Sequence, residues 1–167
     1  RRSRGTNALR HLSVLKFVTC FSLIPLATAA DWLPLAAGNQ WVYRGSGTRA
    51  TAPAVWHVSE AREIGARTYY LFHGLAGGPH LLRNDAGRIV RLDERTRMES
   101  VFWDFTRAPR EPYESALPGA LGMALVASRD AKYEGPAGAY SGLLEFGYPR
   151  TFQIGLVREY FADGIGM

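Results

Sequence analysis

After residue 30 the chain alternates between apolar and polar residues, and turn-forming residues interrupt this pattern every eight to twelve positions. A period of two places alternate side chains on opposite faces of a β-strand, whereas a helix needs a period of 3.6. Regular short strands joined by tight turns are typical of all-β domains. The sequence therefore predicts a mainly β fold, a twisted antiparallel meander. Because open apolar sheet edges are a liability, this meander can curl into a half-barrel or a barrel.

The strand pattern recurs along the whole of this region. The expected strands are residues 40–43, 54–60, 68–73, 80–83, 88–92, 98–105, 123–128, 139–148 and 151–161. A short helix is the alternative for 98–105, and 113–122 is expected to be irregular. Segment 68–73 is apolar on both faces, which predicts a central strand. In 139–148, Tyr140 is expected to share one face with Leu144, Phe146 and Tyr148.

Residues 1–30 have the layout of a secretory signal peptide. They contain five basic residues and no acidic one, followed by an apolar run over 17–26 and the small residues Ala27, Thr28, Ala29 and Ala30. The run is too short to span a bilayer as a helix. We expect cleavage after Ala29 or Ala30. The protein is then secreted or periplasmic, and it meets the membrane only through this peptide during export.

Residues 31–167 are expected to form a single β-rich domain, truncated at its C-terminus, because the last residues read as the lead into another strand. All the surplus positive charge of the chain lies in residues 1–30, the leader, since residues 31–167 hold 15 basic and 15 acidic residues. This balance argues against nucleic acid as a partner, because phosphate binding needs uncompensated positive charge. The only cysteine, Cys20, also lies in the leader.

Four short stretches resemble motifs of a family of secreted bacterial proteins, largely uncharacterised and frequent in Acidobacteria. Residues 31–43 read DWLPLAAGNQWVY, which is similar to the family's opening D-[YW]-[FL]-P-L-x-x-G-N-x-W-x-Y. Residues 103–105 (WDF), 136–140 (PAGAY) and 160–167 (YFADGIGM) resemble three further family motifs, with Asp163 in place of a usual proline. The resemblance implies a secreted β-rich domain and supplies no catalytic residue. A turn at Gly38 and Asn39 is expected to direct Trp41 and Tyr43 into the core.

Residues that could carry chemistry are sparse. His57, His73 and His80 show no metal-ligand spacing, and no serine lies in a nucleophile-elbow motif. Paired carboxylates such as Asp93 with Glu94 are typical of charged turns. We therefore expect no catalytic residue, no cofactor and no metal site, although residues distant in sequence can still converge in space.

Three functional hypotheses remain open. The first is a non-catalytic module that binds an envelope protein or another surface partner. The second is a carrier that holds an apolar small molecule inside a curled sheet. The third is a hydrolase whose essential residues lie partly in the missing C-terminal sequence. The candidate ligand-binding residues are aromatic, namely Trp41, Tyr43, Trp56, Tyr70 and Trp103.

Overall fold

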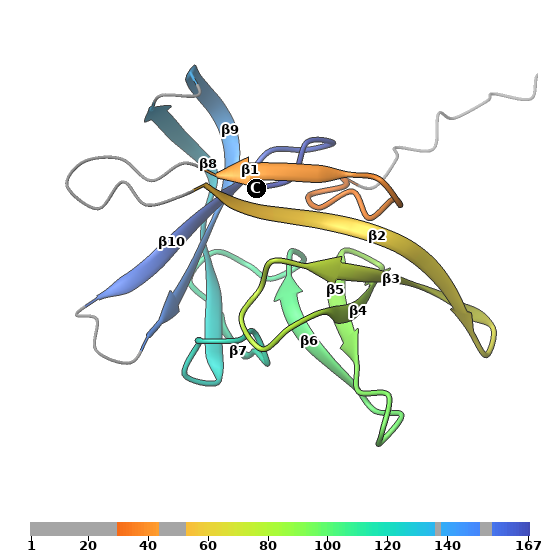
Figure 1. Cartoon of the computed structure of the whole chain (residues 1–167). Coiled ribbons are helices and arrows are strands. Elements are labelled where there is room, and N and C mark those ends of the chain that lie inside the picture. Colours follow the sequence, from red (N-terminus) through yellow and green to blue (C-terminus); the bar gives the residue numbers. More distant parts are fainter. Residues whose placement is uncertain (1–29, 44–52, 136–137, 151–154) are drawn as a thin grey trace, which may run out of the picture.

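The computed structural model describes residues 30–43, 53–135, 138–150 and 155–167 (Figure 1). All regular secondary structure in this part of the chain is β-strand, and none of it is helix. Residues 1–29, on which the signal-peptide prediction rests, lie outside the described residues, as do Pro136 and Ala137. The ten strands form two antiparallel sheets, which confirms the mainly β fold class.

The first sheet has six strands whose spatial order follows the chain. They are β1 (Gln40–Tyr43), β2 (Ala54–Ile64), β3 (Arg67–His73), β4 (His80–Asp85), β5 (Arg88–Leu92) and β6 (Glu99–Asp104). This meander curls into a half-barrel (Figure 1). The helix alternative for residues 98–105 is excluded, because β6 pairs with β5 along Glu99–Asp104.

The second sheet has four strands in the order β10-β9-β8-β7. They are β7 (Pro112–Glu114), β8 (Met123–Gly135), β9 (Gly138–Pro149) and β10 (Leu156–Phe161). The expectation of an irregular 113–122 is wrong at its start, since Tyr113 lies in β7 and its hydroxyl donates to the carbonyl of Phe102 at 3.0 Å. The amide of Ala116 donates to the carbonyl of Val101 at 2.8 Å. This segment therefore lies against the edge formed by β6.

Both sheets contribute to one shared hydrophobic core. Phe72 and Trp103 from the first sheet and Phe146 and Phe161 from the second are all fully buried. Trp103 and Phe161 meet edge to face across the two sheets, with ring centroids 6.0 Å apart. Edge-to-face contacts of this kind add to the burial energy of large rings. The concave interior of the half-barrel is therefore occupied by packed aromatic side chains.

Strand β3 has the central position that its apolar faces predict, between β2 and β4. Phe72 points into the shared core, and Tyr69 on the opposite face is only 2% exposed. Tyr69 packs with Leu81 and Leu92 in a second, smaller apolar cluster. The sheet is thus covered on both faces at this point, which explains why the strand lacks polar alternation.

Tyr140 does not lie on the core face as expected. It is 42% exposed, whereas Leu144, Phe146 and Tyr148 are buried. The pairing of β8 with β9 changes register at three places between Val126 and Tyr133. Each such irregularity interrupts the strict alternation of side chains between the two faces of a strand. A face assigned from residue parity alone therefore fails in the outer half of this hairpin.

Candidate functional site

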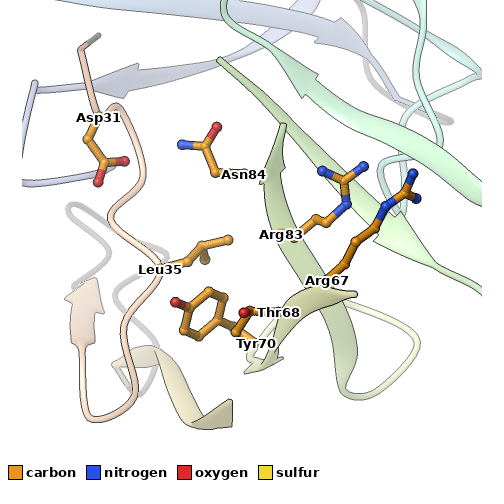
Figure 2. A pocket seen from close by; sticks show the side chains of 7 residues that line it. All are labelled: Asp31, Leu35, Arg67, Thr68, Tyr70, Arg83 and Asn84. Carbon is orange, nitrogen blue, oxygen red and sulfur yellow. The ribbon is translucent and has the colours of Figure 1, made fainter. Parts of the chain in front are cut away.

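A cleft of about 360 Å³ lies between the N-terminal segment and the neighbouring strands β3 and β4 (Figure 2). We call it the N-terminal cleft. Its lining residues are Asp31, Leu35, Arg67, Thr68, Tyr70, Arg83 and Asn84. One wall is the extended segment that precedes β1, and the other is the sheet.

The N-terminal wall is held in place by a turn and by a buried anchor. Leu33 is fully buried in the core. The amide of Gly38 donates to the carbonyl of Val58 at 2.9 Å, and the side-chain amide of Asn39 donates to the carbonyl of Pro34 at 2.8 Å. Gly38 has a φ of +92°, a conformation that favours glycine. The expected turn at Gly38 and Asn39 is confirmed.

The sheet wall presents polar groups from two strands. Tyr70 is partly buried against the core, and Figure 2 shows its hydroxyl pointing toward the N-terminal segment. The amide oxygen of Asn84 accepts a hydrogen bond from the backbone N–H of Gly87 at 3.2 Å. Figure 2 shows its amide nitrogen on the side of Asp31. The Thr68 hydroxyl donates to Glu63 at 2.6 Å. The wall therefore offers both hydrogen-bond donors and acceptors.

The basic rim of the cleft is compensated by acidic neighbours. Arg83 donates to both carboxylate oxygens of Glu99, at 2.6 and 2.8 Å, and to Asp85 at 2.8 Å. Arg67 donates to the same Glu99 at 3.1 Å, and the Tyr69 hydroxyl bonds it as well. These donors, Arg83 first, lower the pKa of Glu99 to about 2. The rim is thus a preorganised ion-pair network rather than a free positive patch.

Replacing Glu99 with Gln is expected to lower the free energy of unfolding by about 1–3 kcal/mol, because Arg83 loses a bidentate, charge-assisted partner. The effect has a pH signature. Since the pKa of Glu99 is lowered from 4.5 to about 2, its contribution is complete above pH 4.5 and declines as the pH falls toward 2. Urea titrations between pH 2 and 6 measure this. Glu94→Gln is the matched control, because Glu94 has only a 3.9 Å ion pair to Arg62. If the difference in free energy of unfolding between wild type and Glu99→Gln is the same at pH 2 and pH 6, the prediction is contradicted.

The acidic end of the cleft is formed by Asp31. Burial raises the pKa of its carboxyl, an effect opposed by the Leu33 amide and reinforced by the nearby Asp163. Its Oδ1 atom is buried and accepts no hydrogen bond from the described residues. The backbone N–H of Asp31 donates to Oδ1 of Asp163 at 2.7 Å, and the Asp31 carbonyl accepts from the Gly164 amide at 2.8 Å. The N-terminal segment and the C-terminal turn therefore meet at this residue.

The chemistry of the cleft fits binding better than reaction. Its lining combines one carboxylate, one amide, two hydroxyls, two paired guanidinium groups and one leucine. None of these lining residues is a histidine or cysteine, and Arg83 is committed to Glu99 and Asp85. A hydrolytic site needs a nucleophile, a base within hydrogen-bond reach and a group that stabilises developing charge. A cleft of this composition instead suits a polar ligand that is held by several hydrogen bonds.

The structure separates the five aromatic candidates. Tyr70 alone lines the cleft. Trp103 is fully buried, and Trp56 and Trp41 are 8% and 9% exposed. Tyr43 and Trp56 lie edge to face at 5.1 Å, and Trp56 lies 6.3 Å from Trp103. Their position in the core means that a ligand reaches Trp103 only if the sheets open. Their role as ligand contacts remains a prediction.

Sequence reasoning identified only Tyr70 among the lining residues and missed the other six, namely Asp31, Leu35, Arg67, Thr68, Arg83 and Asn84. Thr68 and Asn84 lie in strands without any motif, and only the packing of the N-terminal segment against β3 and β4 brings them together. The conspicuous D-x-L-P-L opening is the one signal that points to this place. It marks the segment, but it does not reveal which strands lie opposite.

A second polar feature, Glu159, lies between the two sheets. Its carboxylate accepts from the Trp103 indole N–H at 3.1 Å and from the Tyr148 hydroxyl at 2.7 Å. Burial raises the pKa of this carboxyl, while the two donors oppose the rise. Trp103 belongs to β6, Tyr148 to β9 and Glu159 to β10. The bonds join the sheets, and because both carboxylate oxygens have a donor, a structural role accounts for the residue.

The histidines are also placed by the fold. His57 and His73 are direct cross-strand partners with stacked rings 4.5 Å apart, and the Ser59 hydroxyl lies 2.8 Å from Nε2 of His73. No hydrogen bond among the described residues joins a carboxylate to His73, so a triad is incomplete there. His80 is buried, with a ring nitrogen 3.0 Å from the carbonyl of Ala76. In the described ranges no three metal-ligating side chains gather in one group.

Comparison of the chain with protein families, with curated proteins and with solved structures finds no match. Within the part of the chain that the structure describes, no helix is long and apolar enough to cross a membrane.

Proposed function

We propose that this chain is an exported, non-catalytic β module that binds an envelope protein or another surface partner through the N-terminal cleft. The layout of residues 1–30 supports export. The observation that carries the binding role is the cleft itself, a preformed hollow of about 360 Å³ with Tyr70, Thr68 and Asn84 on one wall and Asp31 on the other. A hollow of this size accepts one side chain or one small unit of a partner rather than a whole protein surface.

The rigidity of both walls supports this proposal. Leu33, Gly38 and Asn39 fix the N-terminal wall, and the Arg83–Glu99 pair stiffens the sheet wall. Binding to a preorganised site avoids the entropic cost of ordering loops.

The apolar carrier receives less support from the same structure. A carrier needs space inside the curled sheet, but Phe72, Trp103 and Phe146 occupy the interior with fully buried rings. The N-terminal cleft, by contrast, is lined largely by polar and charged side chains. The hydrolase alternative gains no support from the cleft, because none of its lining residues is a histidine, cysteine or serine.

Site-specific photocrosslinking tests the proposal in cells that export the protein. A photoreactive amino acid at Thr68 faces the cleft, and the same amino acid at Met98, which is 68% exposed and does not line the cleft, serves as the control. We expect a discrete crosslinked species from position 68 that is absent from position 98. The same adduct from both positions, or none from position 68, contradicts binding at this cleft.

A second variant separates binding from folding. Tyr70→Phe removes only the hydroxyl that points into the cleft, so the partly buried ring and its packing are retained. We expect it to weaken the crosslink while leaving the free energy of unfolding within about 0.5 kcal/mol of wild type. Tyr133→Phe, on an exposed tyrosine of β8, is the matched control and should leave the crosslink unchanged.

A further inference from the structure

The backbone nitrogen of Asp31 lies in an unusually acidic environment. Its N–H donates to Oδ1 of Asp163 at 2.7 Å. The side chain of the same residue adds a second carboxylate, whose Oδ1 is buried and accepts no hydrogen bond from the described residues. The turn that carries Asp163 is fixed by the Gly164 amide, which donates to the carbonyl of Asp31 at 2.8 Å.

The backbone amides of Asp31 and Leu33, which donate to Asp163 and to the Asp31 carboxyl respectively, bring no positive charge to these two carboxylates. A backbone N–H supplies a single hydrogen bond and no charge. Two carboxylates near each other repel, and the pKa of Asp31 is raised by burial and by Asp163 accordingly. No Lys or Arg forms an ion pair with either carboxylate in the described part of the chain. The site lacks a cation.

The position of this site along the chain indicates where the cation comes from. Asp31 follows Ala30 directly, and Ala30 is one of the two residues after which the leader is expected to be cleaved. Cleavage after Ala30 converts the Asp31 amide nitrogen into an α-ammonium group with three N–H donors and a positive charge. Cleavage after Ala29 leaves that nitrogen as an uncharged amide.

We propose that the mature chain begins at Asp31 and that its new α-ammonium docks onto Asp163, with the Asp31 carboxylate as a second acceptor. The reaction is hydrolysis of the Ala30–Asp31 peptide bond, in which water supplies the second oxygen of the Ala30 carboxylate and its two protons convert the Asp31 N–H into the α-ammonium group. One ammonium proton keeps the existing 2.7 Å bond to Asp163. Another is available to the unpartnered Oδ1 of Asp31.

Removal of the leader then completes the fold. The ion pair joins the first residue of the domain to the turn after β10. The indole N–H of Trp41 also donates to this turn, at the carbonyl oxygen of Ile165, over 2.7 Å. Asp31 is in addition a lining residue of the N-terminal cleft. The precursor, which has no charge on this nitrogen, holds that wall less firmly than the processed protein. This inference rests on the proposed export.

The experiment begins with residues 1–167 produced in an exporting bacterial host. Intact-mass measurement of the exported protein identifies the first residue, which we expect to be Asp31. The pKa of its α-amino group is then measured by NMR titration. An unperturbed α-amino group has a pKa of about 7.7–8.0. Docking onto Asp163 should favour the charged form by about tenfold, which raises the pKa by about one unit.

Two variants separate docking from other effects. Asp163→Asn keeps an oxygen acceptor but removes its charge, so the amine pKa should fall toward its ordinary value, with the Asp31 carboxylate as the remaining charged acceptor. Asp130→Asn is the matched control on an exposed acidic residue of β8 and should leave the raised value unchanged. Acetylation of the Asp31 amine should lower the folding equilibrium constant about threefold to fivefold in wild type and much less in Asp163→Asn.

The outcomes distinguish the two proposals. An exported protein that still contains residues 17–26 refutes both cleavage and docking, and it removes the support for export by this leader. A mature chain that begins at Ala30 refutes the docking of Asp31 while leaving export intact. A mature chain that begins at Asp31 with an amine pKa that is ordinary, or that Asp163→Asn does not change, refutes the ion pair alone.

Discussion

Replacing Trp103 with Ala is expected to lower the free energy of unfolding by about 3–5 kcal/mol. The side chain is fully buried, and its ring contacts Trp56 in the first sheet and Phe161 in the second. Its indole N–H also donates to Oε2 of Glu159 at 3.1 Å. The substitution therefore leaves both a cavity and a buried carboxylate oxygen without its donor. Because small domains are stable by about 5–15 kcal/mol, the variant should be close to unfolding.

Equilibrium unfolding in urea, followed by tryptophan fluorescence, measures this loss. Trp103→Phe separates its two causes, since Phe retains much of the ring volume but cannot donate to Glu159. We expect it to cost about half as much as the alanine variant, with most of that cost due to the orphaned carboxylate oxygen. Met98→Ala, on a residue that is 68% exposed, is the surface control and should change stability by about 0.5 kcal/mol at most. An unchanged midpoint for Trp103→Ala would show that the sheets do not share this core.

Gly74→Ala is expected to cost about 3 kcal/mol or more, although it adds a single methyl group. Gly74 follows β3 with a φ of +107°, a conformation that is strained for alanine. A Cβ at this position would lie 2.4 Å from Cδ1 of Trp56 and 2.5 Å from the carbonyl oxygen of Val55. Since Trp56 is held in the core and Val55 contributes backbone, neither neighbour can move cheaply.

The matched control for this prediction is Gly78→Ala in the same connection between β3 and β4. Gly78 has a similar φ of +97°, but a Cβ there would meet no atom within 4 Å. It should therefore show only the conformational cost, about 1–2 kcal/mol. The difference between the losses of unfolding free energy in Gly74→Ala and Gly78→Ala measures the cost of the steric contact alone. Equal costs at both positions would mean that the backbone of β2 does not approach Gly74 this closely.

Residue patterns predict one wall of the N-terminal cleft but not the other. The Gly38–Asn39 turn and the course of residues 31–39 follow from local chemistry, because glycine with positive φ and an asparagine that bonds Pro34 act within a few residues. The opposite wall of the cleft does not follow from local chemistry. Thr68 and Asn84 stand 37 and 53 positions beyond Asp31 along the chain, and only the packing of the N-terminal segment against β3 and β4 brings these three side chains to one cleft.

Strand identity was open to prediction because alternation and turn residues are local properties, and β1, β3 and β5 lie close to where the pattern places them. The chain by itself also determined the charge balance of residues 31–167, and its first 30 residues predict an export signal. Which strands share a sheet was decided by tertiary packing, in which Trp103 of the first sheet is buried against Phe161 of the second. Tyr140 does not lie on the core face predicted for it, because the register shifts between β8 and β9 are set by the pairing of the two strands. The acidic environment of the Asp31 nitrogen also needed the fold, which brings Asp163 to this residue from 132 positions further along the chain.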